Sequence, residues 1–254
     1  MKASIKILSG FILLICILAI LGAGLLIADY CLEYYQGTKS YEEITHLAET
    51  PSDANAEAHD TNSSEEKLPS IDFDVLRAVN PDLIGWIYIP DTRINYPIVK
   101  RENDNNYYLS HLFDGSENKT GCIFLDTRCS LGDPHILIHG HNMANGSMFR
   151  DLNLFRSREF LDSHPTFWIL TPERNYEVTI FACSVVDLGS GVWQLEFPDD
   201  SQKQSWLSIC QREASLRTGV IPSPSDQIVT LSTCSYEFDQ ARWIVQARIL
   251  STKD

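Results

Sequence analysis

The feature that most constrains this chain is an apolar run near its start, because residues 7–28 include no charged side chain. A helix of these 22 residues spans about 33 Å, which is enough to cross the hydrocarbon core of a bilayer. Lys2 and Lys6 precede the run, and the first charges after it are acidic. Since basic flanks stay in the cytoplasm, we expect residues 1–6 inside the cell and the rest of the chain outside.

A cleaved signal peptide is the alternative interpretation of this run. Its apolar region would extend over about 7–15 residues and would end in a small-x-small cleavage site. Here the run is longer and continues past Ala23 to Leu25, Leu26 and Ile27. We therefore predict a retained transmembrane signal anchor over residues 7–28.

The charge of the chain is unevenly distributed. The formal net charge is −14, from 20 Lys+Arg and 34 Asp+Glu, which argues against a nucleic-acid partner and against binding to anionic lipid by charge. Residues 29–74 hold twelve acids and two bases, a net charge of −10, whereas residues 75–254 carry only −6. The acidity therefore describes mainly the segment after the apolar run.

The stretch from residue 50 to 67 is typical of a linker. It is rich in Ser, Asn, Ala, Glu and Asp and lacks aromatic and β-branched apolar residues, so it cannot bury enough surface to offset the entropy of ordering. We predict an acidic linker over residues 29–69, with a short helix possible at 41–48. Charge repulsion would extend this linker and hold a folded domain, residues 70–254, away from the membrane.

The folded domain is predicted to be mainly β. Its apolar segments are short, contain β-branched and aromatic residues and are bounded by turn residues, which favours a barrel or sandwich over a βαβ sheet. The eight expected strands are 83–89, 94–99, 121–125, 135–138, 167–170, 176–186, 227–233 and 243–250.

Helical segments are expected at several places within this domain, with short connections at 148–155 and 157–162. Ser70 is a candidate N-cap for a short helix over residues 71–79. Between the strands 176–186 and 227–233, residues 200–217 place Trp206, Leu207, Cys210 and Ala214 on one face, with Gly219 as a stop signal. The sequence thus predicts a long helix inserted before the strand that ends near Cys234.

The cysteines do not form a metal or disulfide pattern. Their number, seven, is odd, and no Cys-x-x-Cys pair occurs, so neither a dense disulfide framework nor a zinc ribbon is indicated. Most are expected to be small buried hydrophobes, while a pairing of Cys122 with Cys129 stays open.

One cysteine stands beside other reactive residue types. Cys234 closes a predicted strand, and period-2 alternation places Ser232 on the same face. Seven residues connect Cys234 to Arg242, which opens the next strand, so the two residues lie at the same end if these strands pair. His141 follows another strand end.

These three residue types suit nucleophilic catalysis. An unperturbed Cys has a pKa of about 8.5, and a nearby cation favours its thiolate. A histidine can transfer protons, and an arginine supplies a fixed charge with several donors. On spacing alone, a buried cysteine with a surface histidine and a solvated arginine is the favoured interpretation.

The motifs themselves resemble those of a known family. Thr-Leu-Ser-Thr-Cys at 230–234 followed by Arg242 resembles the signature of sortases, and His-Gly-His-Asn-Met at 139–143 resembles their histidine motif. Further stretches resemble class B sortases, and they are 80–87, 96–99, 108–111, 121–126 and 235–238. The resemblance covers residues 71–250.

This resemblance implies an eight-stranded sortase-type β-barrel with an N-terminal helix, and a transpeptidase on the surface of a Gram-positive bacterium. Cys234 would be the nucleophile, His141 the acid and base, and Arg242 the oxyanion or substrate-positioning group, while Ser232 would contact substrate. The partners implied are surface proteins with a C-terminal sorting signal, cleaved after Thr in motifs such as Asn-Pro-x-Thr-Asn, and a peptidoglycan amine that accepts them. No cofactor and no metal is implied.

Several assignments have rivals. His139 is the competitor of His141, and Arg248 is the competitor of Arg242 but lies about 20 Å along the strand. His111 and His135 are expected to be structural. Other cell-wall Cys–His peptidases, L,D-transpeptidases among them, and an inactive tethered binding module are the alternative functions.

Overall fold

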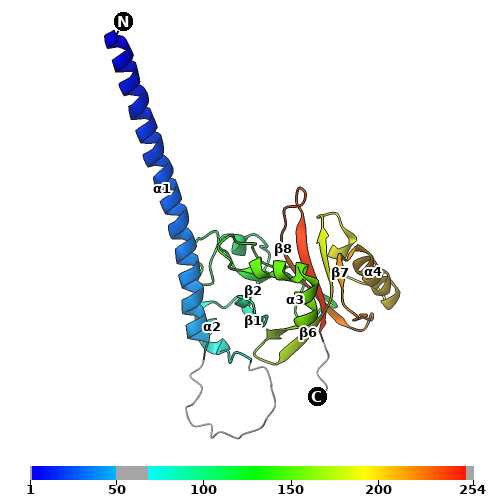
Figure 1. The fold of residues 1–254 in the computed structure, drawn as a ribbon. Helices are drawn as coiled ribbons and strands as arrows, with labels where there is room; N and C mark the ends of the chain where they lie inside the picture. The colour runs from blue at the N-terminus through cyan, green and yellow to red at the C-terminus, as the bar shows by residue number, and fades with distance from the viewer. Residues whose placement is uncertain (1, 50–67, 250–254) are drawn as a thin grey trace.

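The computed structural model describes residues 2–49 and 68–249. Its largest unit is a nine-stranded sheet with the strand order β5-β1-β2-β3-β4-β8-β9-β6-β7. Strand β5, at one edge, also pairs with β6. Eight strands therefore close into a barrel, and β7 extends the edge (Figure 1). The strands are β1 (Leu83–Tyr88), β2 (Asn95–Val99), β3 (Ile123–Leu125), β4 (His135–His139), β5 (Thr166–Leu170), β6 (Asn175–Val186), β7 (Leu216–Arg217), β8 (Gln227–Cys234) and β9 (Arg242–Ile249).

The barrel is mixed. The pairs β2–β3 and β4–β8 are parallel, whereas the other pairs around the barrel are antiparallel. All eight strands expected from the sequence are present, with ends that differ by one or two residues, so the prediction of an eight-stranded, mainly β domain is confirmed. The expected last strand continues to residue 250, which lies outside the described residues.

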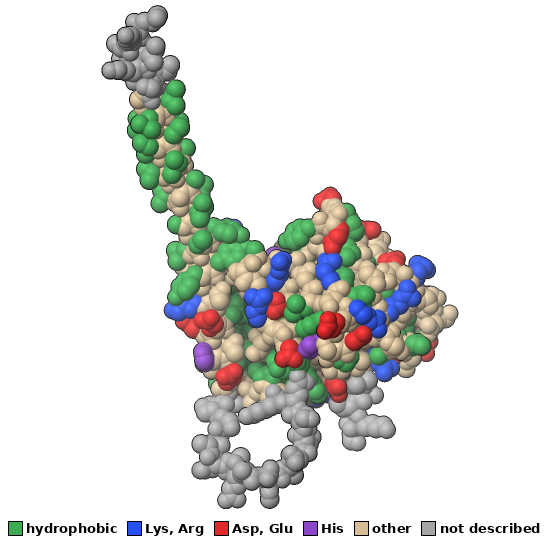
Figure 2. Space-filling view, viewed as in Figure 1, with side chains coloured by type: hydrophobic (Ala, Val, Ile, Leu, Met, Phe, Trp, Pro, Cys, Tyr) green, Lys and Arg blue, Asp and Glu red, His purple; other side chains and the backbone are tan. Residues whose placement is uncertain are grey.

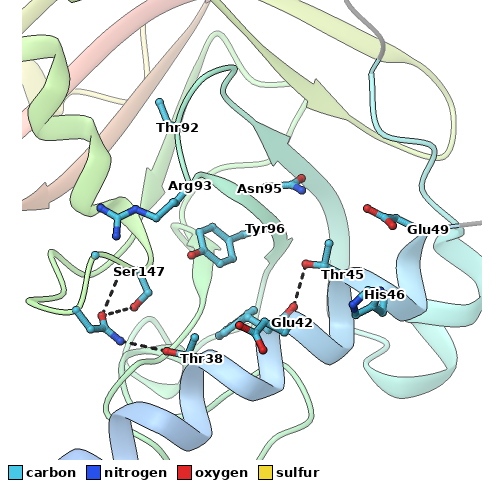
Figure 3. A pocket seen from close by; sticks show the side chains of 13 residues that line it. Thr38, Glu42, Thr45, His46, Glu49, Thr92, Arg93, Asn95, Tyr96 and Ser147 are labelled. Atoms are coloured by element: carbon cyan, nitrogen blue, oxygen red, sulfur yellow. Dashed lines mark hydrogen bonds between the residues drawn. The ribbon is translucent and has the colours of Figure 1, made fainter.

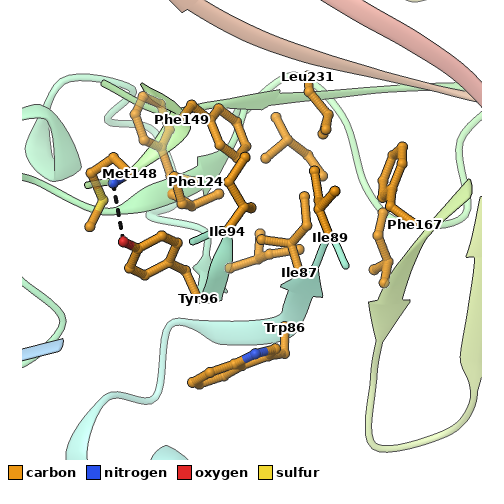
Figure 4. Packing of buried hydrophobic residues seen from close by; sticks show 14 of the residues in the cluster. Trp86, Ile87, Ile89, Ile94, Tyr96, Phe124, Met148, Phe149, Phe167 and Leu231 are labelled. Carbon is orange, nitrogen blue, oxygen red and sulfur yellow. Dashed lines mark hydrogen bonds between the residues drawn. The ribbon is translucent and has the colours of Figure 1, made fainter. Parts of the chain in front are cut away.

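Period-2 alternation divides β8 and β9 between two cores. Val229 and Leu231 point into the barrel with Val245, where they join the main apolar cluster shown in Figure 4. Ile228 and Ile244 belong instead to a second cluster on the outer surface of the barrel. Since Ser232 and Cys234 share the face of Ile228, they also point outward.

Helix α4 (Asp200–Glu213) covers part of that outer face. Its buried residues Trp206, Leu207 and Cys210 pack in the second cluster, as their spacing predicts. The helix ends at Glu213 and does not reach residue 217 as expected, because Leu216 pairs with Cys183 in the short strand β7. The inserted helix thus shields one end of the β8–β9 surface and leaves the Cys234 end open.

The other helices that follow α1 (Lys2–Ala48) are short. Helix α2 (Phe73–Val79) begins after Asp72, whose carboxylate accepts a hydrogen bond from the Val75 amide at 3.0 Å, so Asp72 and not Ser70 is the N-cap. The others are η1 (Tyr107–Leu109), η2 (Phe149–Arg156), α3 (Arg158–Ser163) and η3 (Gly191–Trp193).

The N-terminal helix is longer than the sequence indicated. Helix α1 spans Lys2–Ala48, so residues 29–48 continue the apolar helix and do not form a linker. The helix propagates because Tyr41, Ile44 and Ala48 are buried in the main core along one face. Residues 50–67 of the expected linker lie outside the described residues.

The two halves of α1 have different surroundings. Its large hydrophobic side chains between residues 12 and 27 are 46–74% exposed and cover the part that projects from the domain (Figures 1 and 2). By length and composition the segment Ile12–Ala48 could cross a membrane, which is consistent with an anchor or a signal sequence. The C-terminal half lies against the barrel (Figure 1).

Gly37 permits this close approach, which leads to a prediction about its replacement. Alanine normally stabilises a helix interior relative to glycine by about 1 kcal/mol. A Cβ atom at Gly37 would overlap Thr120 Oγ1 and lie 2.9 Å from Thr120 Cβ. We therefore expect Gly37→Ala to destabilise the protein by about 1–3 kcal/mol, the usual cost of overpacking.

Thermal unfolding of the full chain in detergent micelles tests this expectation. Gly22→Ala is the matched control, because nothing lies within 4 Å of a Cβ atom added there. A Tm for Gly37→Ala equal to or above that of the parent would show that α1 does not dock as the structure indicates.

Candidate active site

Cys234 and Arg242 are direct neighbours across two strands. They are Cα partners in the antiparallel pairing of β8 with β9. Directly opposed residues of an antiparallel pair point to the same face with Cβ atoms about 4.5–5.5 Å apart. The guanidinium of Arg242 also bonds the carbonyl groups of Gln240 and Ala241, at 3.3 and 3.1 Å. The register thus brings a fixed positive charge beside a partly exposed thiol.

His141 follows strand β4, which pairs with β8 on the side opposite β9. Strand β4 runs parallel to β8, with His139 opposite Ser232, and the Gly140 amide extends this pairing by donating to the Ser232 carbonyl at 3.1 Å. The Nε2 atom of His141 lies 2.7 Å from the Leu109 carbonyl oxygen. Because a carbonyl only accepts, Nε2 carries a proton, and Nδ1 is the nitrogen left to exchange one.

His139 has a different partner. Its Nε2 atom lies 3.2 Å from Oδ2 of Asp126, a buried carboxylate that also accepts two hydrogen bonds from the Arg128 guanidinium, at 2.8 and 2.9 Å. Burial acts to raise the pKa of Asp126, but hydrogen bonds from Arg128, His139 and Asn105 outweigh it and hold this pKa well below its usual range. His139 therefore donates to a permanent anion, which makes it a structural member of the site.

A pocket of about 230 Å³ brings all four residues singled out by the sequence together. Cys234, His141, Arg242 and Ser232 each contribute to its wall. The full lining is Asn105, Leu109, Phe124, His139, Gly140, His141, Leu188, Ser232, Thr233, Cys234 and Arg242.

Apart from His139, the other candidate residues lie outside this pocket. His135 is fully buried between the Gln194 carbonyl and the Thr230 hydroxyl, at 2.7 and 2.8 Å, and burial lowers its pKa to about 4. His111 stacks on Tyr107, with ring centroids 4.0 Å apart. Arg248 lies 3.6 Å from Asp226 near the other end of β9.

Asn142 is a site residue to which the sequence assigned no role. Its side-chain amide donates to the Cys234 carbonyl at 2.7 Å, while its oxygen accepts from Arg150 and Asn153, at 3.1 and 3.3 Å. This bridge links the residue after His141 to the cysteine itself. Its position next to His141 in the motif was the available signal.

Leu109, Asn105 and Leu188 also went unassigned. Leu109 acts through its backbone carbonyl, which accepts from His141, and Asn105 and Leu188 line the pocket from distant loops. A backbone acceptor has no side-chain pattern in the sequence, and residues on distant loops meet only in the folded chain. These three residues therefore could be found only from the fold.

Arg156 fixes the loop between Cys234 and Arg242. Its guanidinium donates to the Ser235 hydroxyl and to the Glu237 carboxylate, each at 2.6 Å, and lies 4.2 Å from the ring centroid of Trp243. The hydroxyl of Ser235 bonds Glu237 as well. This network holds the first residues after the thiol in place.

The other thiols of the domain are unsuited to chemistry. All seven cysteines are free, and burial raises the pKa of Cys122, Cys183 and Cys210 to about 12 and that of Cys129 to about 11. Among residues 2–49 and 68–249, no group of three or more His, Cys, Asp or Glu side chains is placed to hold a metal ion.

These pKa shifts predict selective alkylation. A thiol with a raised pKa stays protonated until the pH approaches that value, so at pH 8 a group of pKa 12 is thiolate in about one molecule in 10⁴. With Cys16 and Cys31 replaced by Ser, because both are exposed, iodoacetamide at pH 8 should modify Cys234 alone. Peptide mapping by mass spectrometry measures this, and comparable modification of Cys122 would contradict it.

Comparisons with known proteins give a consistent answer. The sortase domain model matches residues 87–250. Sortase B of Listeria monocytogenes is 36% identical over 180 residues, covering 69% of this chain and 73% of the relative. Sortase B of B. anthracis in complex with AAEK1 matches with a TM-score of 0.72 at 28% identity, covering 86% of this chain and 98% of that one. The Staphylococcus aureus sortase B–substrate complex matches with a TM-score of 0.66 at 25% identity, covering 71% and 85%.

These matches place the chain in the sortase family, the class of protein that its closed barrel and cysteine pocket define. Within that family it is a sortase B, a cysteine transpeptidase. The L,D-transpeptidase alternative is thereby set aside.

Proposed function

We propose that this sortase B cleaves a C-terminal sorting signal after its Thr residue and transfers the protein to an amine of the cell-wall peptide. The observation that carries the proposal is the strand register that opposes Cys234 to Arg242 within the pocket that His141 also lines. The S. aureus relative was solved as a substrate complex, which supports a peptide as the occupant of this pocket.

The first half of the proposed reaction forms a thioester. The Cys234 thiolate attacks the backbone carbonyl carbon of the Thr residue, and the negative charge moves to the carbonyl oxygen. Arg242 stabilises that oxyanion because it keeps its charge at all physiological pH values. As the C–N bond breaks, His141 gives a proton to the leaving amine from Nδ1, while the Leu109 carbonyl fixes its ring through Nε2.

The second half reverses the roles. The acceptor amine attacks the thioester carbon, His141 takes the proton that the amine loses, and Cys234 leaves as a thiolate. Ser232 is buried on the face of Cys234, and we propose that it contacts the substrate near the Thr position.

The apolar half of α1 gives the proposed location. We propose that it is a retained anchor with residues 1–6 in the cytoplasm and the catalytic domain on the extracellular face. The exposed apolar side chains between residues 12 and 27 and the basic residues Lys2 and Lys6 support this orientation.

A peptide library tests the proposed function. The full chain in detergent micelles is incubated with peptides built on Asn-Pro-x-Thr-Asn and its variants, with and without a small amine acceptor. We expect cleavage after Thr, a thioacyl adduct on Cys234 by mass spectrometry, and a ligated product only when the amine is present. Cleavage at another residue, or turnover without an adduct, would contradict the proposal.

A further inference from the structure

Helix α1 is bonded to the chain segment that holds His141 in place. The hydroxyl of Tyr41 is buried, donates to the Gly121 carbonyl at 2.6 Å and lies 3.1 Å from the sulfur of Cys122. About two turns toward the N-terminus, the carboxylate of Glu33 accepts from both the backbone amide and the side-chain ammonium of Lys119, at 3.0 and 2.8 Å. The segment 118–122 is therefore attached to α1 at two levels.

Gly121 in turn lies against the imidazole of His141. Its φ angle is +60°, and a Cβ atom there would lie 3.1 Å from Cδ2 of His141 and 3.0 Å from the Leu109 carbonyl oxygen. That carbonyl is the acceptor of the His141 Nε2 proton. The same residue that accepts from Tyr41 thus lies next to both the ring and the group that orients it, with no room for a side chain between them.

The segment on the other side of His141 is attached to α1 as well. The amide of Asn145 donates to the hydroxyl of Thr38 at 3.3 Å, and the Phe149 amide donates to the carbonyl of His141 at 2.9 Å. Thr38 and Tyr41 lie one turn apart on α1. His141 is consequently placed between two segments that contact the same turn of this helix.

Part of the interface beside these contacts is open. A cavity of about 550 Å³ separates Thr45 and His46 of α1, and Glu49 just after it, from Thr92 and Arg93 in the turn between β1 and β2 (Figure 3). Direct bonding around this cavity is concentrated at Thr38 and Tyr41, so a change in their hydroxyl groups should be transmitted to the neighbouring segments.

We infer that α1 belongs to the active-site framework and that Tyr41 is a positioning residue for His141, acting through Gly121. This inference rests on the proposed role of His141. A consequence is that the position of His141 is coupled to that of α1. Catalysis then depends on Tyr41, a residue outside the barrel.

The test compares two hydroxyl deletions in the full chain in detergent micelles. Tyr41→Phe removes the donor to Gly121 and keeps the ring. Thr218→Val is the matched control, because it removes a hydroxyl that donates to the Ile180 carbonyl at 2.9 Å, away from the pocket. We measure Tm, kcat and KM for the best-cleaved library peptide, and the His141 Cε1–H signal with ¹³C-labelled histidine, assigned by its loss in His141→Asn.

For Tyr41→Phe we expect kcat to fall about tenfold, within the hundredfold that a 1 Å misplacement can cost. KM should stay unchanged, and the His141 signal should shift. Thr218→Val should leave kcat and the His141 signal unchanged even where its Tm falls. Thr38→Val should also lower kcat, but by less than Tyr41→Phe. It serves as the second test variant if Tyr41→Phe does not fold.

The inference is overturned if Tyr41→Phe keeps kcat within about twofold of the parent, or loses no more than Thr218→Val, with an unmoved His141 signal. The proposed function fails separately, if His141→Asn itself retains the parent kcat. The two failures are distinguishable because the His141 signal reports ring position without turnover.

Discussion

Replacing Cys234 with Ala should abolish transpeptidation, with a loss of kcat on the order of 10⁶-fold, the size found when a covalent nucleophile is removed. No other thiol of the domain can substitute. Cys122, Cys129, Cys183 and Cys210 are buried, and their pKa values are raised to about 11–12. The measurement is peptide cleavage together with a mass-spectrometric search for the thioacyl adduct.

Cys129→Ala is the control for this experiment. It removes a buried thiol on the short connection between β3 and β4 and should leave both the adduct and kcat near the parent values. Because Cys234 is only partly buried at a strand end, its replacement should change Tm little. Peptide cleavage that persists in Cys234→Ala would contradict the assignment of Cys234 as the nucleophile.

Replacing His141 with Asn should lower kcat by about 10²- to 10⁴-fold, the usual contribution of a positioned acid and base. Asparagine ends near the place of Nδ1, short of the Nε2 atom that meets the Leu109 carbonyl, so it loses this bond as well as the titrating ring. What it lacks is a group that gives a proton to the leaving amine and later takes one from the acceptor. Both half-reactions should slow, and alkylation of Cys234 should still report an intact pocket.

His139→Asn separates the two histidines of the motif. His139 donates to Asp126 through Nε2, and without it the Arg128 guanidinium still bonds both oxygens of that carboxylate, so we expect a loss below about tenfold. Both side chains line the same pocket, so proximity alone does not distinguish them. If His139→Asn proved the more damaging replacement, the assigned roles of the two histidines would have to be exchanged.

The position of α1 also bears on how such experiments are designed. The composition of the chain suggests that residues 70–254 form the whole catalytic unit, but Tyr41, Ile44 and Ala48 belong to its main core. The backbone also connects the end of α1 to the domain, since the Asp72 amide donates to the Ala48 carbonyl at 2.8 Å. A fragment without α1 would expose this apolar surface, so the full chain is the appropriate material.

Local patterns were sufficient for the strands and for the pair of Cys234 and Arg242. Alternation of apolar residues is a property of a few consecutive positions, and a connection of seven residues between two strands places their adjoining ends together. Helix spacing likewise predicted the buried face of α4. Its end at Glu213 was missed, because β7 exists only where Leu216 meets Cys183 on β6.

By itself the sequence determined the eight strands, the apolar helix and the residue types of the pocket, because these follow from short-range periodicity and motif. Only the tertiary structure decided that the Leu109 carbonyl orients His141, that Asn142 bonds the Cys234 carbonyl, and that α1 extends to Ala48 against the barrel. The polar and charged composition of residues 29–48 predicts a solvated tether. A helix forms there because packing against the barrel stabilises it. Its contacts, such as Tyr41 with Gly121 and Thr38 with Asn145, come from residues more than fifty positions away.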